Sequence, residues 1–269
     1  MALMANLECW NRFPLKVDQW HHMHIGPASL WVIRMADEFR FALGQDEKED
    51  LLHEYDSSAP EPCADPPADL DMGRWIFPNV PAEVIVSPTM PDRPIVVRPE
   101  SPLVLSPHST ATFFMLVPLC IELKAGLREK TSMCRLPLIK MTNIWFGTPE
   151  SGFLCYGLRT WARRRIESFP LTPHRFICPV TIRNQSDTEL SFQRMCVRVE
   201  HLGLYRGQTR IWSNMVRLTS KGPQHSSQLD YMETAPDFEP ILGQMAPPPK
   251  PLKRSIFKFS LDSLKAFLE

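Results

Sequence analysis

Hydrophobic and β-branched residues recur along the chain in short runs that proline or glycine interrupts. The pattern is clearest from residue 98 to residue 165, in runs such as TATFFMLVPLCIEL and NIWFGTPESGFLCYG. β-Branched and aromatic residues favour strands, whereas proline is confined to strand starts, edges and turns. The middle of the chain therefore predicts antiparallel β-sheet.

An early segment, IGPASLWVIRMADEFRFAL, predicts a β-hairpin. Leu30 to Met35 forms its first strand, residues 36–38 turn, and Phe39 to Leu43 returns. Because side chains alternate between the two faces of a strand, Phe39 and Phe41 share one face.

Two segments depart from the strand pattern. Residues 44–72 are acidic and rich in proline and alanine, so they bury too little apolar area to offset their ordering entropy, and we expect a mobile surface loop. The last residues, SLDSLKAFLE, predict a short helix with Ser260 as its N-cap and an apolar stripe that includes Leu261 and Leu264.

The 269 residues are enough for two domains, each with its own core. Pro170 and Pro173 interrupt the strand pattern, and we place the boundary there. Residues 1–170 then form an N-terminal β-rich domain, and residues 171–269 form a C-terminal domain that ends in a proline-rich segment and the helix. The predicted fold class is all-β, with two β-sandwich or jelly-roll-like domains.

Composition narrows the range of functions. Thirty basic and thirty acidic residues cancel, which argues against a nucleic-acid partner. The cysteines are widely spaced without a CxxC pair, which is typical of buried thiols in a reducing compartment. The start resembles no signal peptide and no run approaches the length of a membrane span, so we expect a cytoplasmic protein without direct membrane insertion.

Four segments resemble an uncharacterised prokaryotic family, domain of unknown function 432. They are IGPASLWVIRMADEFRFAL, PLVLSPHSTATFFMLVPLCIEL, NIWFGTPESGFLCYG and CPVTIRNQSDTELSFQRMCV. The resemblance covers most of the chain outside the acidic segment and the tail. It implies no activity, cofactor or catalytic residue, although an association of the family with mechanosensitive channels adds a membrane protein to the possible partners.

The segment WHHMH holds the first candidate site. His22 and His24 lie on one face of a strand, and neutral histidines at this spacing can chelate a divalent metal when a third ligand is supplied. His53, Glu54 and His108 are conceivable third ligands. The alternative, which we favour, is a solvated strand end.

The segment LRTWARRR holds the second candidate. Arg159, Trp161, Arg163 and Arg165 fall on one face of an extended strand, where they offer a platform for an anion or an acidic surface. The alternative is that these arginines stack on the tryptophan and hold a domain junction together.

No catalytic residue is assigned. Ser106 and His108 lie close together in LSPHST, but nucleophilic catalysis also needs an orienting acid and an oxyanion hole, so a turn that starts a strand is the favoured interpretation.

Our leading hypothesis is a binding or assembly module without enzymatic activity or cofactor, either homo-oligomeric or docked to a protein partner through exposed β edges or the tail helix. The alternatives are a sensor of an anionic metabolite at the arginine face and a metal-dependent enzyme at the histidines.

Overall fold

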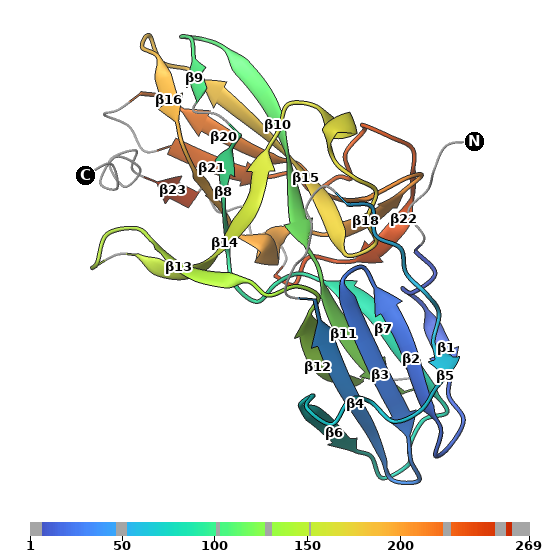
Figure 1. The fold of residues 1–269 in the computed structure, drawn as a ribbon. Helices are drawn as coiled ribbons and strands as arrows, with labels where there is room; N and C mark the ends of the chain where they lie inside the picture. Colours follow the sequence, from blue (N-terminus) through green and yellow to red (C-terminus); the bar gives the residue numbers. More distant parts are fainter. Residues whose placement is uncertain are drawn as a thin grey trace. The chain divides into compact units, whose positions relative to one another are not determined.

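The computed structural model describes residues 7–46, 53–100, 103–126, 131–150, 152–222, 227–250 and 257–259 (Figure 1). In these ranges the regular structure consists of strands and two short 3₁₀ helices, which confirms the all-β prediction. The predicted helix that begins at Ser260 lies outside the described residues.

Contacts divide the chain into two compact units, and each unit is assembled from separate segments. The first unit takes Met1–Thr89, Pro118–Lys140 and Pro170–Arg175, and the second takes Met90–Val117, Met141–Phe169 and Phe176–Glu269. The predicted boundary near residue 170 would leave two continuous domains, whereas the compact units draw on residues from both sides of it.

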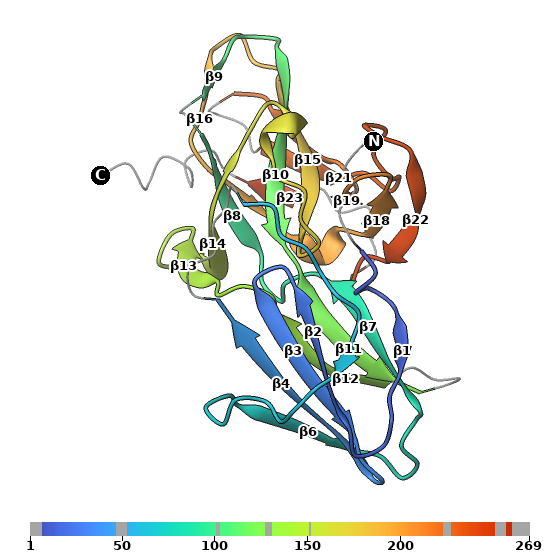
Figure 2. The same cartoon turned by 45° about the vertical axis from the view of Figure 1, so that its right-hand side comes forward.

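The first unit is a sandwich of two antiparallel sheets (Figures 1 and 2). One sheet has the order β5-β2-β3-β4-β6 and the other has the order β1-β7-β11-β12. The strands of the first unit are β1 (Arg12–Pro14), β2 (Trp20–Ile25), β3 (Ala28–Arg34), β4 (Glu38–Gln45), β5 (Glu61–Pro62), β6 (Met72–Ile76), β7 (Glu83–Thr89), β11 (Cys120–Ala125) and β12 (Thr131–Pro137).

The alternation of β2 shows why this sheet has an inner and an outer face. Met23 and Ile25 are fully buried, whereas His22 is half-buried and His24 is exposed. Leu30 of β3 and Val84 and Ile121 of the opposite sheet are also fully buried. His22 and His24 therefore face away from the core of the sandwich, whereas His21 is buried on the same face as Met23 and Ile25.

The described part of the acidic segment runs along the outer edge of β2, where the sequence predicts a mobile loop. Backbone hydrogen bonds join Ser58 N to His24 O at 3.0 Å and Cys63 N to Trp20 O at 2.9 Å. The physical reason is that β2 would otherwise be an edge strand with unpaired backbone groups, and this segment pairs with them.

The second unit contains three sheets. The largest has the order β22-β18-β19-β15-β20-β21-β23 with β10 also paired to β15, a second has the order β13-β14-β8-β17, and the third pairs β16 with β9. Its elements are β8 (Ile95–Pro99), β9 (Leu103–Leu105), β10 (Thr110–Pro118), β13 (Thr142–Phe146), β14 (Phe153–Ala162), η1 (Ile166–Ser168), β15 (Arg175–Asn184), β16 (Leu190–Phe192), β17 (Met195–Val197), η2 (Val199–His201), β18 (Leu204–Gly207), β19 (Ile211–Ser213), β20 (Val216–Ser220), β21 (Ser227–Tyr231), β22 (Ile241–Ala246) and β23 (Phe257–Phe259).

Parallel pairing occurs in the second unit, although the sequence predicts antiparallel sheet for the middle of the chain. β15 is parallel to both β19 and β20, and β14 is parallel to β8. Aromatic residues fill part of the core, where Phe114, Phe169 and Trp212 pack in one cluster with Leu116 and Ile177.

Candidate functional site

The outer face of the sheet β5-β2-β3-β4-β6 carries the candidate site. Ser29 and Trp31 point outward from β3 because they alternate with the fully buried Leu30 and Val32. Across the pairing with β4, Ser29 lies opposite Gly44, and Trp31 lies opposite Ala42. Trp31 is thus an aromatic residue that is only half-buried on the outer face of the sheet.

Gly44 gives the indole of Trp31 room to lie against β4. A Cβ atom at residue 44 would lie 3.3 Å from Cζ3 of Trp31 and 3.8 Å from Cδ1 of Leu70. On the other side, the ring centroids of His22 and Trp31 are 4.6 Å apart. Neighbours on both sides therefore fix the orientation of the indole.

Three segments enclose an open groove of about 470 Å³ over this face. The turn after β2 and strand β3 provide one side, the end of β4 provides another, and the acidic segment provides the third. The groove is lined by Gly26, Pro27, Ser29, Trp31, Gly44, Gln45, Asp46, Tyr55, Pro67, Asp69 and Leu70. Its volume falls within the range of small-molecule sites, and apolar walls with a few polar groups are typical of them.

Tyr55 is held in the groove wall by a buried histidine of the same unit. The ring centroids of Tyr55 and His174 are 5.1 Å apart in an edge-to-face arrangement, and His174 is fully buried. Gly26 also packs on His174 and has a φ of 61°, in the left-handed region. The bottom of the groove near Gly26 and Tyr55 is therefore built on a packed, aromatic support.

The polar groups of the described lining residues are neutral or acidic. Asp46 and Asp69 supply carboxylates, whereas Gln45, Ser29 and Tyr55 supply neutral groups that donate or accept hydrogen bonds. No lysine or arginine is among the described lining residues. Chemically, the groove can stack a planar or apolar group on Trp31 and hydrogen-bond its polar substituents.

A family model described as "Protein of unknown function (DUF432)" matches residues 9–265. The chain belongs to this family. No curated protein and no solved structure matches it. The DUF432 match includes every residue that lines the groove and both candidate sites predicted from the sequence.

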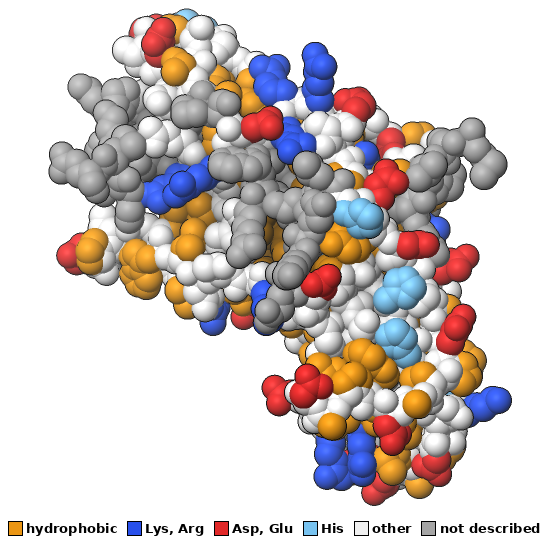
Figure 3. Space-filling view, in the orientation of Figure 1, with side chains coloured by type: hydrophobic (Ala, Val, Ile, Leu, Met, Phe, Trp, Pro, Cys, Tyr) orange, Lys and Arg blue, Asp and Glu red, His pale blue; other side chains and the backbone are white. Residues whose placement is uncertain are grey.

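In this DUF432 chain, the predicted histidine pair lies beside the groove. Figure 3 shows histidine side chains among hydrophobic and acidic ones on the visible surface. The His22 ring packs against Trp31 in a tilted arrangement, and burial lowers the pKa of His22, as does the nearby His24. In the described ranges no three histidine, cysteine, aspartate or glutamate residues are grouped so that they could hold a metal.

Two of the three third ligands that the sequence suggested for a metal, His53 and His108, contact other residues. The His53 ring packs against Tyr55, with centroids 5.1 Å apart. His108 belongs to the second unit, where its Nε2 lies 2.9 Å from a carboxylate oxygen of Asp187. This exposed pair stands at a turn in which Ser109 Oγ donates to Ser106 O.

The predicted arginine face is described only in part. Arg159 and Trp161 belong to β14, but their side chains lie outside the described part of the structure. Arg163 donates to Ser168 O at 2.5 Å, and its guanidinium lies 5.4 Å from the centroid of Phe169. Arg165 is exposed, and its carbonyl accepts a hydrogen bond from Ser168 Oγ.

These contacts favour a structural role for Arg163, because its guanidinium is committed to neighbours within its own unit. The anion platform stays a prediction for Arg159, Trp161 and Arg165.

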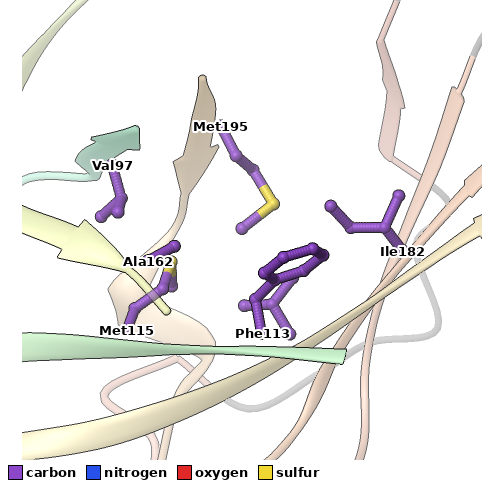
Figure 4. Close-up of a pocket in the computed structure, with 7 residues that line it drawn as sticks. Val97, Phe113, Met115, Ala162, Ile182 and Met195 are labelled. Carbon is purple, nitrogen blue, oxygen red and sulfur yellow. The ribbon is translucent and has the colours of Figure 1, made fainter. Parts of the chain in front are cut away.

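A second cavity, in the second unit, has a different character (Figure 4). Seven apolar side chains line it, and Met115 and Met195 are among those that point into it. Its volume of about 10 Å³ accommodates at most one water molecule. We interpret it as a gap in core packing that flexible methionines partly fill.

Sequence reasoning missed the groove, although it singled out the neighbouring histidines. The available signal was Trp31, a large aromatic residue at an outward position of the predicted hairpin. The groove also needs residues 44–46 and 55–70, and the prediction of a mobile loop removed these residues from consideration.

None of the helices in the described part of the chain has the length and apolar character needed to cross a membrane.

Proposed function

We propose that this protein is a binding module whose ligand lies in the groove of the first unit. The observation that carries the proposal is the half-buried Trp31 in a groove of about 470 Å³, held between His22 and Gly44 and surrounded by hydrogen-bonding side chains. Aromatic rings supply much of the contact energy in such sites, and fixed polar groups orient the ligand. We also propose the cytoplasmic location that the cysteine pattern predicts.

Nuclear magnetic resonance on the full chain tests this proposal. Amines, sugars and carboxylic acids are added in turn, and the amide signals of Gly44 and Gln45 and the indole signal of Trp31 are followed. We expect at least one class to shift all three signals, and Trp31→Ala to abolish the shifts of the other two.

Ile76→Ala is the matched control, because Ile76 is an exposed apolar residue of the first unit that is not among the described lining residues. It should leave the shifts unchanged. Ligands that shift signals only outside the groove, or no shift with any class, would show the proposal to be wrong.

A second candidate function, assembly, is favoured by the edge of the sheet β13-β14-β8-β17. Trp145 of β13 and Leu154 of β14 are directly paired across the hairpin, and they are 48% and 41% exposed. β13 contains no charged residue, so two copies can pair edge to edge without like-charge repulsion. We therefore propose a second copy of this chain as the partner, in a two-fold arrangement.

Light scattering at several protein concentrations tests the assembly proposal. We expect the mass of a dimer, and we expect the double variant Trp145→Ser, Leu154→Ser to give the mass of a monomer. Val104→Ser removes another exposed apolar side chain from a different strand, β9, and should leave the dimer intact. A wild-type monomer at the highest concentration would exclude this interface.

A further inference from the structure

The formal charge of the groove identifies the class of ligand it selects. Among the eleven lining residues that the structure describes, Asp46 and Asp69 are acidic and the other nine are uncharged. Both acidic residues are exposed at its rim. A ligand with a negative group would be repelled by both carboxylates, whereas a positive group would be attracted to both.

The indole of Trp31 adds a second, independent preference for positive charge. The face of an aromatic ring carries negative potential, and tryptophan binds cations most strongly of the aromatic side chains. His22 and Gly44 restrict the ring to one orientation, so its attraction to a cation is not offset by the entropy cost of ordering the side chain. Tyr55 contributes a further ring to the same groove.

Apolar residues give the groove affinity for the hydrocarbon part of such a ligand. Pro27, Pro67 and Leu70 line it together with the two aromatic residues. An alkyl chain laid on these side chains leaves water, and burial of its apolar surface favours binding. The groove is thus complementary to a positive group at the end of a short alkyl chain.

We propose that the groove binds an organic cation, an alkylammonium or alkylguanidinium group, with its charge attracted by Asp46, Asp69 and the ring face of Trp31 and its chain against the apolar lining residues. This inference rests on the proposed function of the groove and specifies its ligand. The chemistry is shared by free di- and polyamines and by lysine or arginine side chains of a protein partner.

Calorimetric titration of the full chain with three ligands of equal chain length isolates the contribution of charge. The ligands are 1,5-diaminopentane, 1,5-pentanediol and glutarate, which are positive, neutral and negative. We expect the diamine to bind at least about tenfold more tightly than the other two, and its affinity to fall with added salt, because salt screens charges at an exposed site.

The double variant Asp46→Asn, Asp69→Asn should lower the diamine affinity by about tenfold or more, since it removes both charges at nearly constant shape. Asp71→Asn is the matched control, because Asp71 is an exposed aspartate of the same segment that does not line the groove. Both variants alter exposed side chains, and unfolding midpoints equal to that of the wild type confirm that the fold is kept.

A lysine-containing tetrapeptide with blocked termini, titrated beside the diamine, distinguishes the two sources of the cation. Tighter binding of the peptide indicates a protein partner, and tighter binding of the diamine indicates a free amine. Preferred binding of the diol or of glutarate would overturn the cation inference and leave the groove as a binding site. Absence of binding by both cations would also overturn it, while the resonance experiment above would still test the groove with other ligand classes.

Discussion

Gly26 lines the groove and has a backbone conformation that favours glycine. It has a φ of 61°, and a Cβ atom there would lie 2.1 Å from Nδ1 of the buried His174. We predict that Gly26→Ala lowers the free energy of unfolding by about 1–3 kcal/mol, the usual cost of a strained backbone conformation. It should also displace Tyr55, which packs on His174. Urea unfolding measures the first effect.

Gly243→Ala provides the control for this substitution. A Cβ atom at Gly243 would meet no atom within 4 Å, and the residue lies in strand β22 without a positive φ. The change in unfolding free energy should stay within about 0.5 kcal/mol. Equal effects of the two substitutions would contradict the assignment of Gly26 as a required glycine.

Glu38 is a buried carboxylate that two arginines neutralise. Arg74 donates two hydrogen bonds to it, at 2.9 and 3.0 Å, and Arg40 donates a third at 2.6 Å. These hydrogen bonds lower the pKa of Glu38 below its ordinary value of 4.5, and those from Arg74 have the largest effect. The ionised form is therefore favoured by folding.

A lowered pKa means that Glu38 stabilises the fold above pH 4.5 and that this contribution is lost as the pH falls through the lower pKa of the folded state. We predict that Glu38→Gln lowers the thermal midpoint at neutral pH and that the difference from wild type shrinks progressively below pH 4.5. Thermal unfolding at stepwise pH measures this. A difference that stays constant with pH would show that the carboxylate charge does not contribute.

At the scale of elements, the described part of the acidic segment makes backbone contacts that its composition does not predict. Ser58 and Cys63 donate backbone hydrogen bonds to β2, and the amide of Gly26 donates to Asp56 O at 3.0 Å. We predict that the amides of Ser58 and Cys63 exchange with deuterium on the order of tenfold or more slowly than that of the exposed Asp65. Rapid exchange of all three amides would contradict this prediction and support the mobile loop that composition predicts.

The local pattern predicted the hairpin near the start of the chain correctly. The expected strands of residues 30–35 and 39–43 correspond to β3 (Ala28–Arg34) and β4 (Glu38–Gln45). Their turn is short and their alternation is regular, so neighbouring residues alone determine the structure. Fold class follows from the same local signals repeated along the chain.

Parallel pairing could not be predicted in this way. β15 is buried along nearly its whole length, which is typical of strands with both faces covered. Its partners β19 and β20 follow it in the chain, but no local pattern distinguishes a parallel neighbour from an antiparallel one. The groove escaped prediction for a related reason, since Trp31, Asp46 and Asp69 are brought together only by the packing of three separate segments.

At the scale of the whole molecule, the two compact units are interleaved in sequence. Strands before residue 170 pair with strands after it, since β8 pairs with β17, β9 pairs with β16, and β10 pairs with β15. The first unit likewise takes Pro170–Arg175 in addition to its earlier segments. Pro170 and Pro173 therefore interrupt the strand pattern, but strands before and after them still pair with each other.

This interleaving predicts the result of cutting the chain at residue 170. The fragment 1–170 would retain β9 and β10 without the strands they pair with and β8 with only β14, and the fragment 171–269 would retain β16 and β17 without their partners and β15 without β10. Unpaired edges and uncovered apolar faces favour aggregation, so we expect each fragment alone to be insoluble or to lack a cooperative unfolding transition.

Co-expression of the two fragments provides the decisive comparison. Because the missing strand partners are then supplied in trans, we expect a soluble complex that contains both fragments and unfolds cooperatively. Circular dichroism and thermal unfolding of each sample measure this. Two fragments that fold separately, each with a cooperative transition, would show instead that the chain consists of two continuous domains divided at residue 170, and that the strand pairs across this point contribute little to stability.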